Sequence, residues 1–309
     1  MEMHQLRYMA AVARTGNFSR AAERCHVSQP SLSQQIQKLE SELGERLFDR
    51  LRRQATLTPA GEAFLPRAER ILAEVDAAQR EAREACGLIR GKLSVGVLPT
   101  IAPYFLPAAV AQFAAQFPGV EVVLQEETTG RLLNMLAACE TDLAVVSLPL
   151  KDERFEFETL LTEELLLALP AKHPLNRKRT IHLTDLEGER FILMKEGHCL
   201  GDQVLGFCTS KDFHPQVSCR SAQVETIQAL VRAGLGVSIV PPMATTPTAG
   251  PRPQYRSLAA PRPERTVVAA WFGHRPPGRA GAELLRCLKR VSAGEAALTP
   301  PITKSDAAH

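Results

Sequence analysis

The sequence predicts a fold of α plus α/β type: a small helical unit with a β-hairpin wing, one long helix, and a C-terminal α/β domain. Short apolar helical repeats fill the N-terminal stretch, and an unbroken helical pattern follows. From Gly91 onwards, apolar strands alternate with helices, which favours a mainly parallel sheet with helices on its faces. With 309 residues, the chain is long enough for two or three compact units.

Three short helices are expected at the N-terminus. The first ends at Gly16, and the second is expected over 19–25. The third begins after Ser28, whose hydroxyl suits an N-cap, and ends at Gly44. Its apolar spacing predicts a buried stripe made of Leu32, Ile36, Leu39 and Leu43.

A wing and a long helix are expected next. Residues 48–58 are basic and rich in strand-forming types, which predicts the hairpin wing. From Pro59 to about Ile89 the pattern is one helix with an apolar face. That face either packs on its own domain or meets a second copy, and we favour a dimer helix because its spacing approaches a coiled-coil seam. The predicted boundaries are 1–60 for the winged helical unit, 61–90 for the linker and dimerisation helix, 91–294 for the α/β domain and 295–309 for a disordered tail.

The charge distribution favours contact with phosphate at the N-terminal unit. The chain nets +3, and residues 1–61 carry nine basic and six acidic side chains, so this unit holds the whole excess. No apolar run approaches the roughly 20 residues of a membrane span. Glu2 and the absence of a leader pattern complete the expectation of a cytoplasmic protein with no membrane contact.

The seven cysteines are scattered along the chain. Such a set is neither a structural disulfide framework nor a zinc site, because no pair has metal-ligand spacing. We therefore expect no metal and no cofactor.

The outer face of the third helix carries short polar side chains that suit the reading of DNA bases. Gln34 can pair with adenine, and the wing arginines suit backbone phosphate. From the pattern alone, an ordinary solvated helix face is an equally good interpretation. The candidate DNA-binding residues are Gln29, Pro30, Ser31, Ser33, Gln34, Lys38, Arg50, Arg52 and Arg53.

A second candidate site is the segment GHCLGDQVLGFC, residues 197–208. Cys199 is expected in the first turn of a helix, where free amides and the helix dipole lower the pKa of a thiol. His198 beside it can supply a proton or positive charge, and Asp202 lies one turn on.

The spacing of Cys199 and Cys208 carries a further expectation. Nine residues of helix separate two Cα atoms by roughly 13 Å, whereas a disulfide needs them within about 7 Å. If these thiols bond, the helix between them must open, which Gly201 and Gly206 would ease. The alternative is that both cysteines are simply core residues.

The stretch 16–64 resembles the helix-turn-helix of the LysR family of transcriptional regulators, above all in VSQPSLSQQI and LTPAGE. The resemblance implies a winged helix-turn-helix (motif about 18–37), a linker helix, and a two-lobed regulatory domain like periplasmic binding proteins. It also implies transcription regulation, with double-stranded DNA and RNA polymerase as partners, and a homodimer or homotetramer.

GHCLGDQVLGFC and VLPTIAPYFLP resemble the OxyR branch of that family, which senses hydrogen peroxide. The resemblance implies that Cys199 is the peroxidatic and Cys208 the resolving cysteine of a reversible intramolecular disulfide. It implies activation of oxidative-stress genes and reduction by thioredoxin or by glutaredoxin and glutathione. The peroxide-pocket residues that it implies are Thr100, Thr129, His198, Asp202 and Arg265.

Two positions depart from that pattern, and other interpretations stay open. Gly201 stands where the branch often has a basic residue, and the Pro-rich loop 245–253 is atypical. From the residues alone, the preferred interpretation is that Thr100 is a turn residue and Thr129 a helix N-cap. Peroxide would be consumed stoichiometrically, so we expect a sensor and not an enzyme.

Two other functions fit parts of the sequence. One is a LysR-type regulator that binds a small organic effector between its lobes. The other, from a different class, is a thiol peroxidase or ligand-binding protein, which would not need the first 60 residues.

Overall fold

The computed structural model describes residues 1–49, 55–84, 89–245, 253–273 and 275–294. They form two compact units, one built mainly from residues 1–88 and the other mainly from 89–309. The wing tip with Arg50, Arg52 and Arg53, and the expected tail at 295–309, lie outside the described residues.

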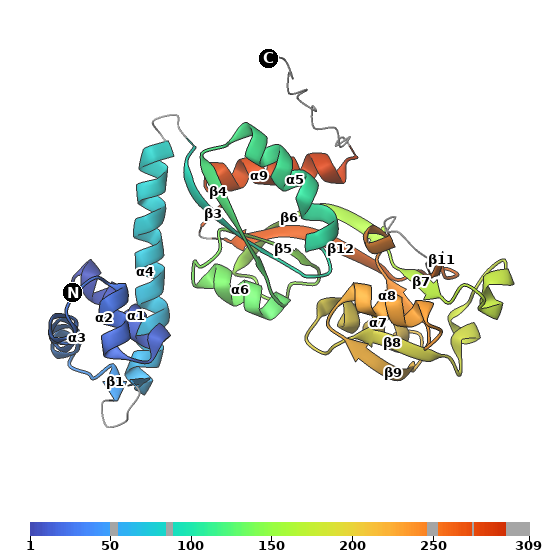
Figure 1. Cartoon of the computed structure of the whole chain (residues 1–309), viewed down its shortest axis with the longest axis horizontal. Coiled ribbons are helices and arrows are strands. Elements are labelled where there is room, and N and C mark those ends of the chain that lie inside the picture. The colour runs from blue at the N-terminus through green and yellow to red at the C-terminus, as the bar shows by residue number, and fades with distance from the viewer. Residues whose placement is uncertain (50–54, 85–88, 246–252, 274, 295–309) are drawn as a thin grey trace, which may run out of the picture. The chain divides into compact units, whose positions relative to one another are not determined.

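The N-terminal unit packs short helices and a small hairpin around one apolar core (Figure 1). β1 and β2 pair antiparallel, as expected for the base of a wing. The elements in chain order are α1 (Met3–Thr15), α2 (Phe18–Arg24), α3 (Gln29–Leu43), β1 (Phe48–Asp49), β2 (Thr56–Leu57) and α4 (Pro59–Glu84).

The helix ends fall where their capping residues predict. Gly16 and Gly44 take left-handed conformations with φ of 62° and 74° and end α1 and α3. The Ser28 hydroxyl accepts the Ser31 backbone N–H at 3.4 Å and opens α3. Asn17 caps α2 in the same way, through two backbone N–H groups.

The expected stripe of α3 is confirmed except at its end. Leu32, Ile36 and Leu39 are fully buried, but Leu43 is 38% exposed, so its predicted burial is wrong. Leu43 lies in the last turn before the Gly44 cap, and the described part of the unit leaves this turn largely uncovered.

The long helix α4 packs on its own unit through its first half. Ala68 is fully buried, and Phe64, Leu65, Ile71 and Leu72 lie against the N-terminal core. The first turns of the apolar face are therefore used within the unit, and a dimer seam along α4 stays a prediction.

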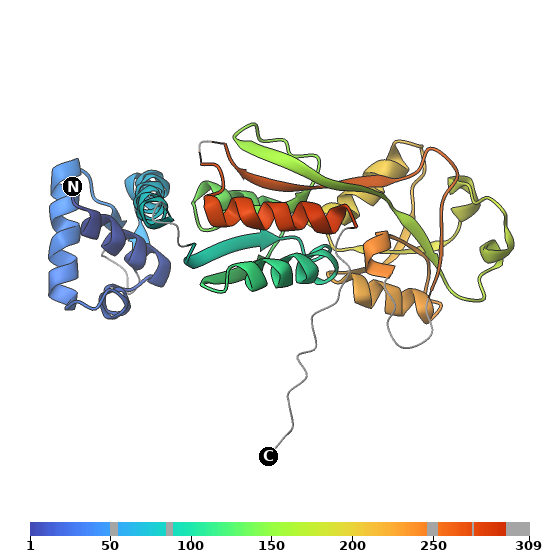
Figure 2. The same ribbon diagram turned by 90° about the horizontal axis from the view of Figure 1, so that it is seen from above.

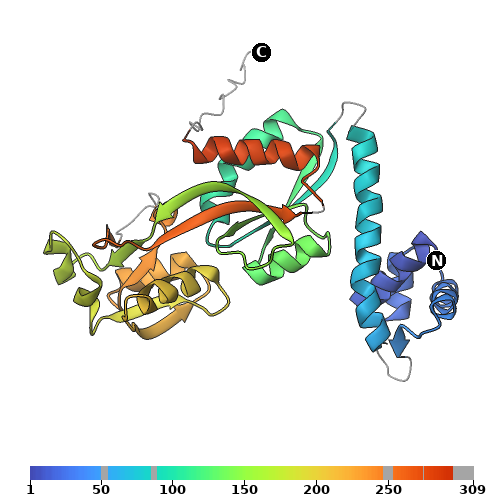
Figure 3. The same cartoon turned by 180° about the vertical axis from the view of Figure 1, so that it is seen from behind.

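The C-terminal unit begins with a mixed five-stranded sheet in the order β4-β3-β5-β12-β6, which we call lobe 1. Helices α5 and α9 lie side by side on one face (Figure 2), and α6 covers the other (Figures 1 and 3). Its elements are β3 (Gly91–Val97), α5 (Ala102–Gln116), β4 (Val120–Glu126), α6 (Thr129–Ala137), β5 (Leu143–Ser147), β6 (Phe155–Glu164), β12 (Glu264–Phe272) and α9 (Arg279–Ser292).

The rest of the unit forms lobe 2, with a three-stranded antiparallel sheet β10-β7-β11 and a parallel pair β8-β9. Its core includes side chains of α7 and α8. Its elements are β7 (Leu166–Leu169), η1 (Pro174–Arg177), η2 (Leu183–Leu186), β8 (Arg190–Met194), α7 (Cys199–Thr209), β9 (Gln216–Ser221), α8 (Val224–Arg232), β10 (Ser238–Val240), η3 (Pro242–Thr245) and β11 (Gln254–Arg256).

The expectation of a mainly parallel sheet is wrong. Strand β3 pairs parallel with β4 and β5, but β12 runs antiparallel to both β5 and β6. The reason is connectivity: β6 leads the chain from lobe 1 into lobe 2, and β12 brings it back, so the two strands run in opposite directions (Figure 3). We call β6 and β12, the two strands that cross between the lobes, the hinge strands, and they carry part of the site described below.

Neither a membrane span nor a metal cluster is found in the described part of the chain. None of its helices combines the length and apolar composition needed to cross a bilayer. Among the same residues, no three His, Cys, Asp or Glu side chains gather as metal ligands would.

Candidate functional site

Helix α7 carries both key cysteines and begins at the first of them. β8 ends at Met194, Gly197 takes a left-handed φ of 86°, and His198 occupies the N-cap of the helix. From Cys199 the helix runs unbroken to Thr209, which includes Cys208. The expected first-turn position of Cys199 is therefore confirmed.

The two thiols are free and far apart. Neither Cys199 nor Cys208 is bonded to another cysteine. At 1.5 Å per residue, the intact helix holds their Cα atoms about 13.5 Å apart, well beyond disulfide reach. The structure is thus that of the reduced chain, and a bond between these thiols requires α7 to open.

Cys208 lies on the face of α7 that packs into lobe 2. It is fully buried, in line with Leu200 and Val204 at helical spacing. Burial raises the pKa of the Cys208 thiol to about 11, because an apolar site disfavours the thiolate. In this state Cys208 is a neutral core residue.

Cys199 lies on the opposite side of the helix, half-buried, beside the first residue of α6. The buried Thr129 hydroxyl lacks a hydrogen bond of standard geometry, but it lies close enough to the thiol to lower its pKa. The positive charge of Arg265 and the Leu200 backbone N–H act in the same direction, whereas Asp202 acts against them.

Burial outweighs these contributions and raises the pKa of Cys199. The expectation that its position in the first helical turn leaves a lowered pKa is therefore wrong for this state. Sequence reasoning weighed the helix dipole and the neighbouring residues, but it could not weigh the desolvation of the thiol in the folded chain.

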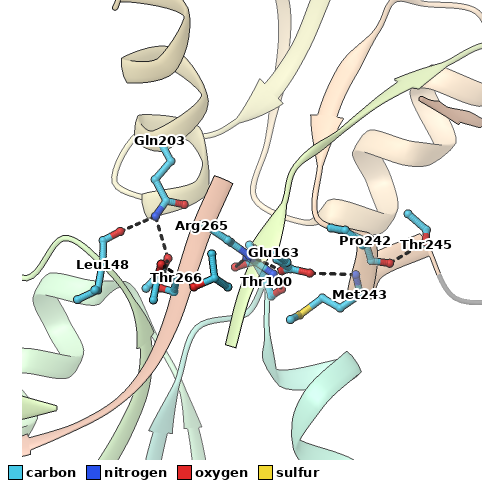
Figure 4. Close-up of polar contacts among 11 residues, drawn as sticks. Thr100, Leu148, Glu163, Gln203, Pro242, Met243, Thr245, Arg265 and Thr266 are labelled. Atoms are coloured by element: carbon cyan, nitrogen blue, oxygen red, sulfur yellow. Dashed lines mark hydrogen bonds and ion pairs between the residues drawn. The ribbon is translucent and has the colours of Figure 1, made fainter. Parts of the chain in front are cut away.

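Arg265 is held deep between the lobes by two partners (Figure 4). Its side chain is buried, and its Nε donates to Glu163 Oε1 at 2.6 Å. Its Nη1 and Nη2 donate to the Oγ1 and backbone oxygen of Thr100, at 3.3 and 3.4 Å. Arg265 and Glu163 face each other in the register of β12 and β6, so the hinge strands themselves place this ion pair.

Gln203 is a member of the site that sequence reasoning missed. It lies one turn after Cys199 on α7, and its Nε2 donates to Ser147 Oγ at 2.8 Å and to the Leu148 oxygen at 2.6 Å (Figure 4). Ser147 Oγ donates in turn to the Thr266 oxygen at 3.1 Å. Gln203 therefore fastens the reduced helix to lobe 1, and its i, i+4 spacing from Cys199 was the available signal.

The other predicted pocket residues take different places. Thr100 is buried on Arg265, and Thr129 reaches Cys199. Asp202 is exposed in the first turn of α7, and its negative charge raises the pKa of the Cys199 thiol. His198 precedes Cys199 as the backbone N-cap, without a side-chain capping bond. These contacts form a polar site around Cys199.

Gly201 explains how α7 lies so close to β8. A Cβ atom at this position would come within 3.1 Å of the Met194 oxygen and 3.2 Å of the Met194 Cβ. The departure noted at this position is therefore also a packing feature, because a larger side chain would require the helix to move. At Gly206, by contrast, an added Cβ would meet no atom within 4 Å.

The candidate DNA-reading residues lie on the outer face of α3. Gln34 and Lys38 are exposed, while the opposite face is buried in the core. This arrangement leaves short polar groups free at the start of the helix. Of the other described candidates, Ser33 is partly buried, and the rest are exposed: Gln29, Pro30 and Ser31.

Comparison with known families matches both units. Residues 3–62 match the bacterial regulatory helix-turn-helix protein model of the lysR family, and residues 87–293 match the LysR substrate binding domain. The chain is 35% identical over 271 residues to the DNA-binding transcriptional dual regulator OxyR of Escherichia coli K12, covering 86% of this chain and 88% of the relative.

Solved structures of OxyR proteins also superpose on this chain over almost its whole length. A full-length OxyR from Pseudomonas aeruginosa, with a cysteine replaced by aspartate, superposes with a TM-score of 0.76 at 32% identity, covering 94% of this chain and 98% of that one. A hydrogen peroxide-bound cysteine-to-serine mutant of Corynebacterium glutamicum OxyR gives 0.62 at 28% identity, covering 96% and 93%. The chain thus belongs to the LysR family of transcriptional regulators, and within it to the OxyR branch.

Proposed function

We propose that this protein is a DNA-binding regulator that senses hydrogen peroxide through a reversible disulfide between Cys199 and Cys208. The observation that carries the proposal is the placement of these cysteines at the two ends of one continuous helix, with Cys199 beside Thr129 and within the field of Arg265. The names of its relatives, which include hydrogen peroxide-inducible genes activators, point the same way.

The first step is oxidation of Cys199. The small thiolate population attacks one oxygen of the peroxide, the O–O bond breaks, and Cys199 becomes a sulfenic acid while hydroxide leaves. Hydroxyls at Thr100 and Thr129 suit hydrogen bonds to peroxide oxygens, and the Arg265 guanidinium offsets charge on the thiolate and on the departing oxygen. His198 and Asp202 stand at the helix start, where they suit proton exchange with solvent.

The second step needs α7 to unwind. While the helix is intact, Cys208 is buried and protonated and lies about 13.5 Å away by helix geometry. Opening the helix exposes Cys208, whose thiolate attacks the sulfenic sulfur; the S–S bond forms and hydroxide leaves as water after taking a proton. Overall, two thiols and one peroxide give one disulfide and two waters.

The structural signal is the release of Gln203. This side chain bonds Ser147 and Leu148 only while α7 is helical, so the oxidised chain loses a link between the lobes. A change at the hinge then alters how regulatory domains pair in a dimer or tetramer, and with it the DNA-bound arrangement. Reduction by thioredoxin, or by glutaredoxin with glutathione, would restore the helix.

The N-terminal unit would supply the DNA contact. The exposed face of α3 would enter the major groove, with Gln34 and the serines at base edges and Lys38 near phosphate. The wing arginines Arg50, Arg52 and Arg53 belong to the same proposal. Fluorescence anisotropy with promoter fragments should show an affinity that falls steeply with salt, and binding indifferent to salt would contradict it.

Disulfide mapping tests the redox proposal. The reduced full-length chain is treated with one equivalent of peroxide, alkylated and digested with trypsin, which cuts after Lys195 and Lys211. The peptide 196–211 should lose two hydrogens and carry no alkyl group on either cysteine. In Cys208→Ser, Cys199 should instead be trapped as sulfenic acid by a cyclic diketone.

The exposed Cys219 provides a matched control, because Cys219→Ser should leave the 196–211 bond intact. Free thiols in peptide 196–211 after peroxide, or a bond from Cys199 to a different cysteine, would contradict the proposal.

A further inference from the structure

The Glu163 carboxylate is fixed at both of its oxygens beneath Arg265. Oε1 accepts Arg265 Nε at 2.6 Å, and Oε2 accepts the Met243 backbone N–H of η3 at 3.4 Å (Figure 4). The side chains of Arg265 and Glu163 are 0% and 12% exposed. A carboxylate held this way forms a tight, largely desolvated ion pair with the arginine.

That pairing changes what Arg265 can do for a neighbouring thiol. In a weakly solvated site, an unpaired guanidinium would stabilise a nearby thiolate strongly, because little water screens its charge. The Glu163 carboxylate bonded to Nε fixes the orientation of the guanidinium, so Arg265 is not free to turn toward a neighbouring thiolate. Only the Nη side of the guanidinium remains directed at Thr100.

The charged groups that act on Cys199 are few among the described residues. Arg265 of β12 favours the thiolate, and Asp202 of α7 itself opposes it. Thr129 of α6 offers a hydroxyl, and His198 lies at the N-cap. Glu163 does not act on the thiol directly, so any influence it has must pass through Arg265.

We propose that Glu163 is a positioning residue that restrains the sensor: it holds the Arg265 guanidinium on Thr100, so that the guanidinium cannot turn toward the Cys199 sulfur. This inference rests on the proposed role of Cys199 as the reacting thiol. It adds that the peroxide concentration needed for a response depends on the carboxylate of Glu163, which lies on a hinge strand 102 residues from Arg265 in sequence.

The test is the pH profile of Cys199 alkylation in the reduced full-length chain. Iodoacetamide labelling is followed by mass spectrometry of peptide 196–211, whose fragments separate Cys199 from Cys208. Glu163→Gln keeps a hydrogen-bond acceptor for Nε but removes the charge. Its alkylation midpoint should fall by about one pH unit, with about tenfold faster labelling at pH 7.

Two variants guard against a purely structural effect. Glu163→Asp keeps the charge but draws it back, so the fold is preserved and a smaller downward shift is expected. Glu164→Gln is the matched control: Glu164 pairs with exposed Arg262 at 3.1 Å and should leave the midpoint unmoved.

A double variant shows whether Glu163 acts through the arginine. Arg265→Gln should raise the midpoint, and adding Glu163→Gln to it should change nothing further. An unmoved or raised midpoint in Glu163→Gln and Glu163→Asp, or a further shift in the double variant, overturns the inference. Because the alkylation assay uses no peroxide, its result can be interpreted even if the proposed disulfide does not form. Likewise, disulfide mapping does not depend on the role of Glu163.

Discussion

Gly206→Ala should make the proposed disulfide harder to form. Gly206 lies inside α7, has an ordinary helical backbone, and an added Cβ would meet no atom within 4 Å. Alanine is favoured over glycine in a helix by about 1 kcal/mol. This gain applies to the reduced state, where α7 is helical, and is lost when α7 opens.

The expected shift follows from that difference. The equilibrium constant for disulfide formation against glutathione should fall about fivefold, and the reduction potential should rise by about 20 mV for a two-electron couple. The assay equilibrates wild type and variant in glutathione buffers and quantifies the 196–211 disulfide by mass spectrometry. Thr226→Ala, an exposed helix-favouring change on α8, is the control and should leave the constant unchanged. An unchanged or larger constant in Gly206→Ala would refute the idea that the helix competes with the bond.

Four other outcomes follow from the same structure. Gln203→Ala should move the thiol–disulfide equilibrium the other way, toward the disulfide by about thirtyfold, since it removes two hydrogen bonds of about 1 kcal/mol each from the state with α7 intact. The pKa of Cys208 is about 11 in the folded chain, above the ordinary value of a thiol in the unfolded chain, so the free energy of unfolding should fall as the pH rises between these two values. Urea titrations measure this fall, and the unfolding free energy of Cys208→Ala should fall less over the same pH range. Ile36→Ala should cost the N-terminal unit about 2–5 kcal/mol in thermal or urea unfolding, because the side chain is fully buried. Gln34→Ala should lose about 1–3 kcal/mol of its binding preference for operator DNA over unrelated DNA, with no change in how the binding constant depends on salt. Lys38→Gln should instead reduce the slope of log binding constant against log salt concentration by about one. Anisotropy titrations over a salt series measure both effects.

Local signals predicted the local structure well. Glycine at 16 and 44 and the cap at Ser28 mark helix ends through conformations that depend on a few neighbouring residues. The first-turn position of Cys199 followed from Gly197 in the same way. The burial of Leu43 was mispredicted because helical spacing identifies a face but not how far the neighbouring elements extend along it.

Long-range packing decided what sequence reasoning missed. The Gln203 bonds to Ser147 and Leu148 join residues 56 and 55 positions apart, across the two lobes. The Glu163–Arg265 pair depends on the antiparallel register of the hinge strands, which a parallel-sheet expectation could not supply. The raised pKa of Cys199 also depends on the folded chain, because burial of the thiol outweighs the contributions of its neighbours.

Hydrogen exchange across residues 200–208 measures most directly whether helix α7 and the proposed Cys199–Cys208 disulfide exclude each other. In the reduced chain these amides should exchange slowly, because α7 is continuous and packed on lobe 2. After one equivalent of peroxide, in a sample whose 196–211 bond has been verified by mass, they should exchange at close to the rate of unstructured peptide. Retained protection in that oxidised sample would contradict the account.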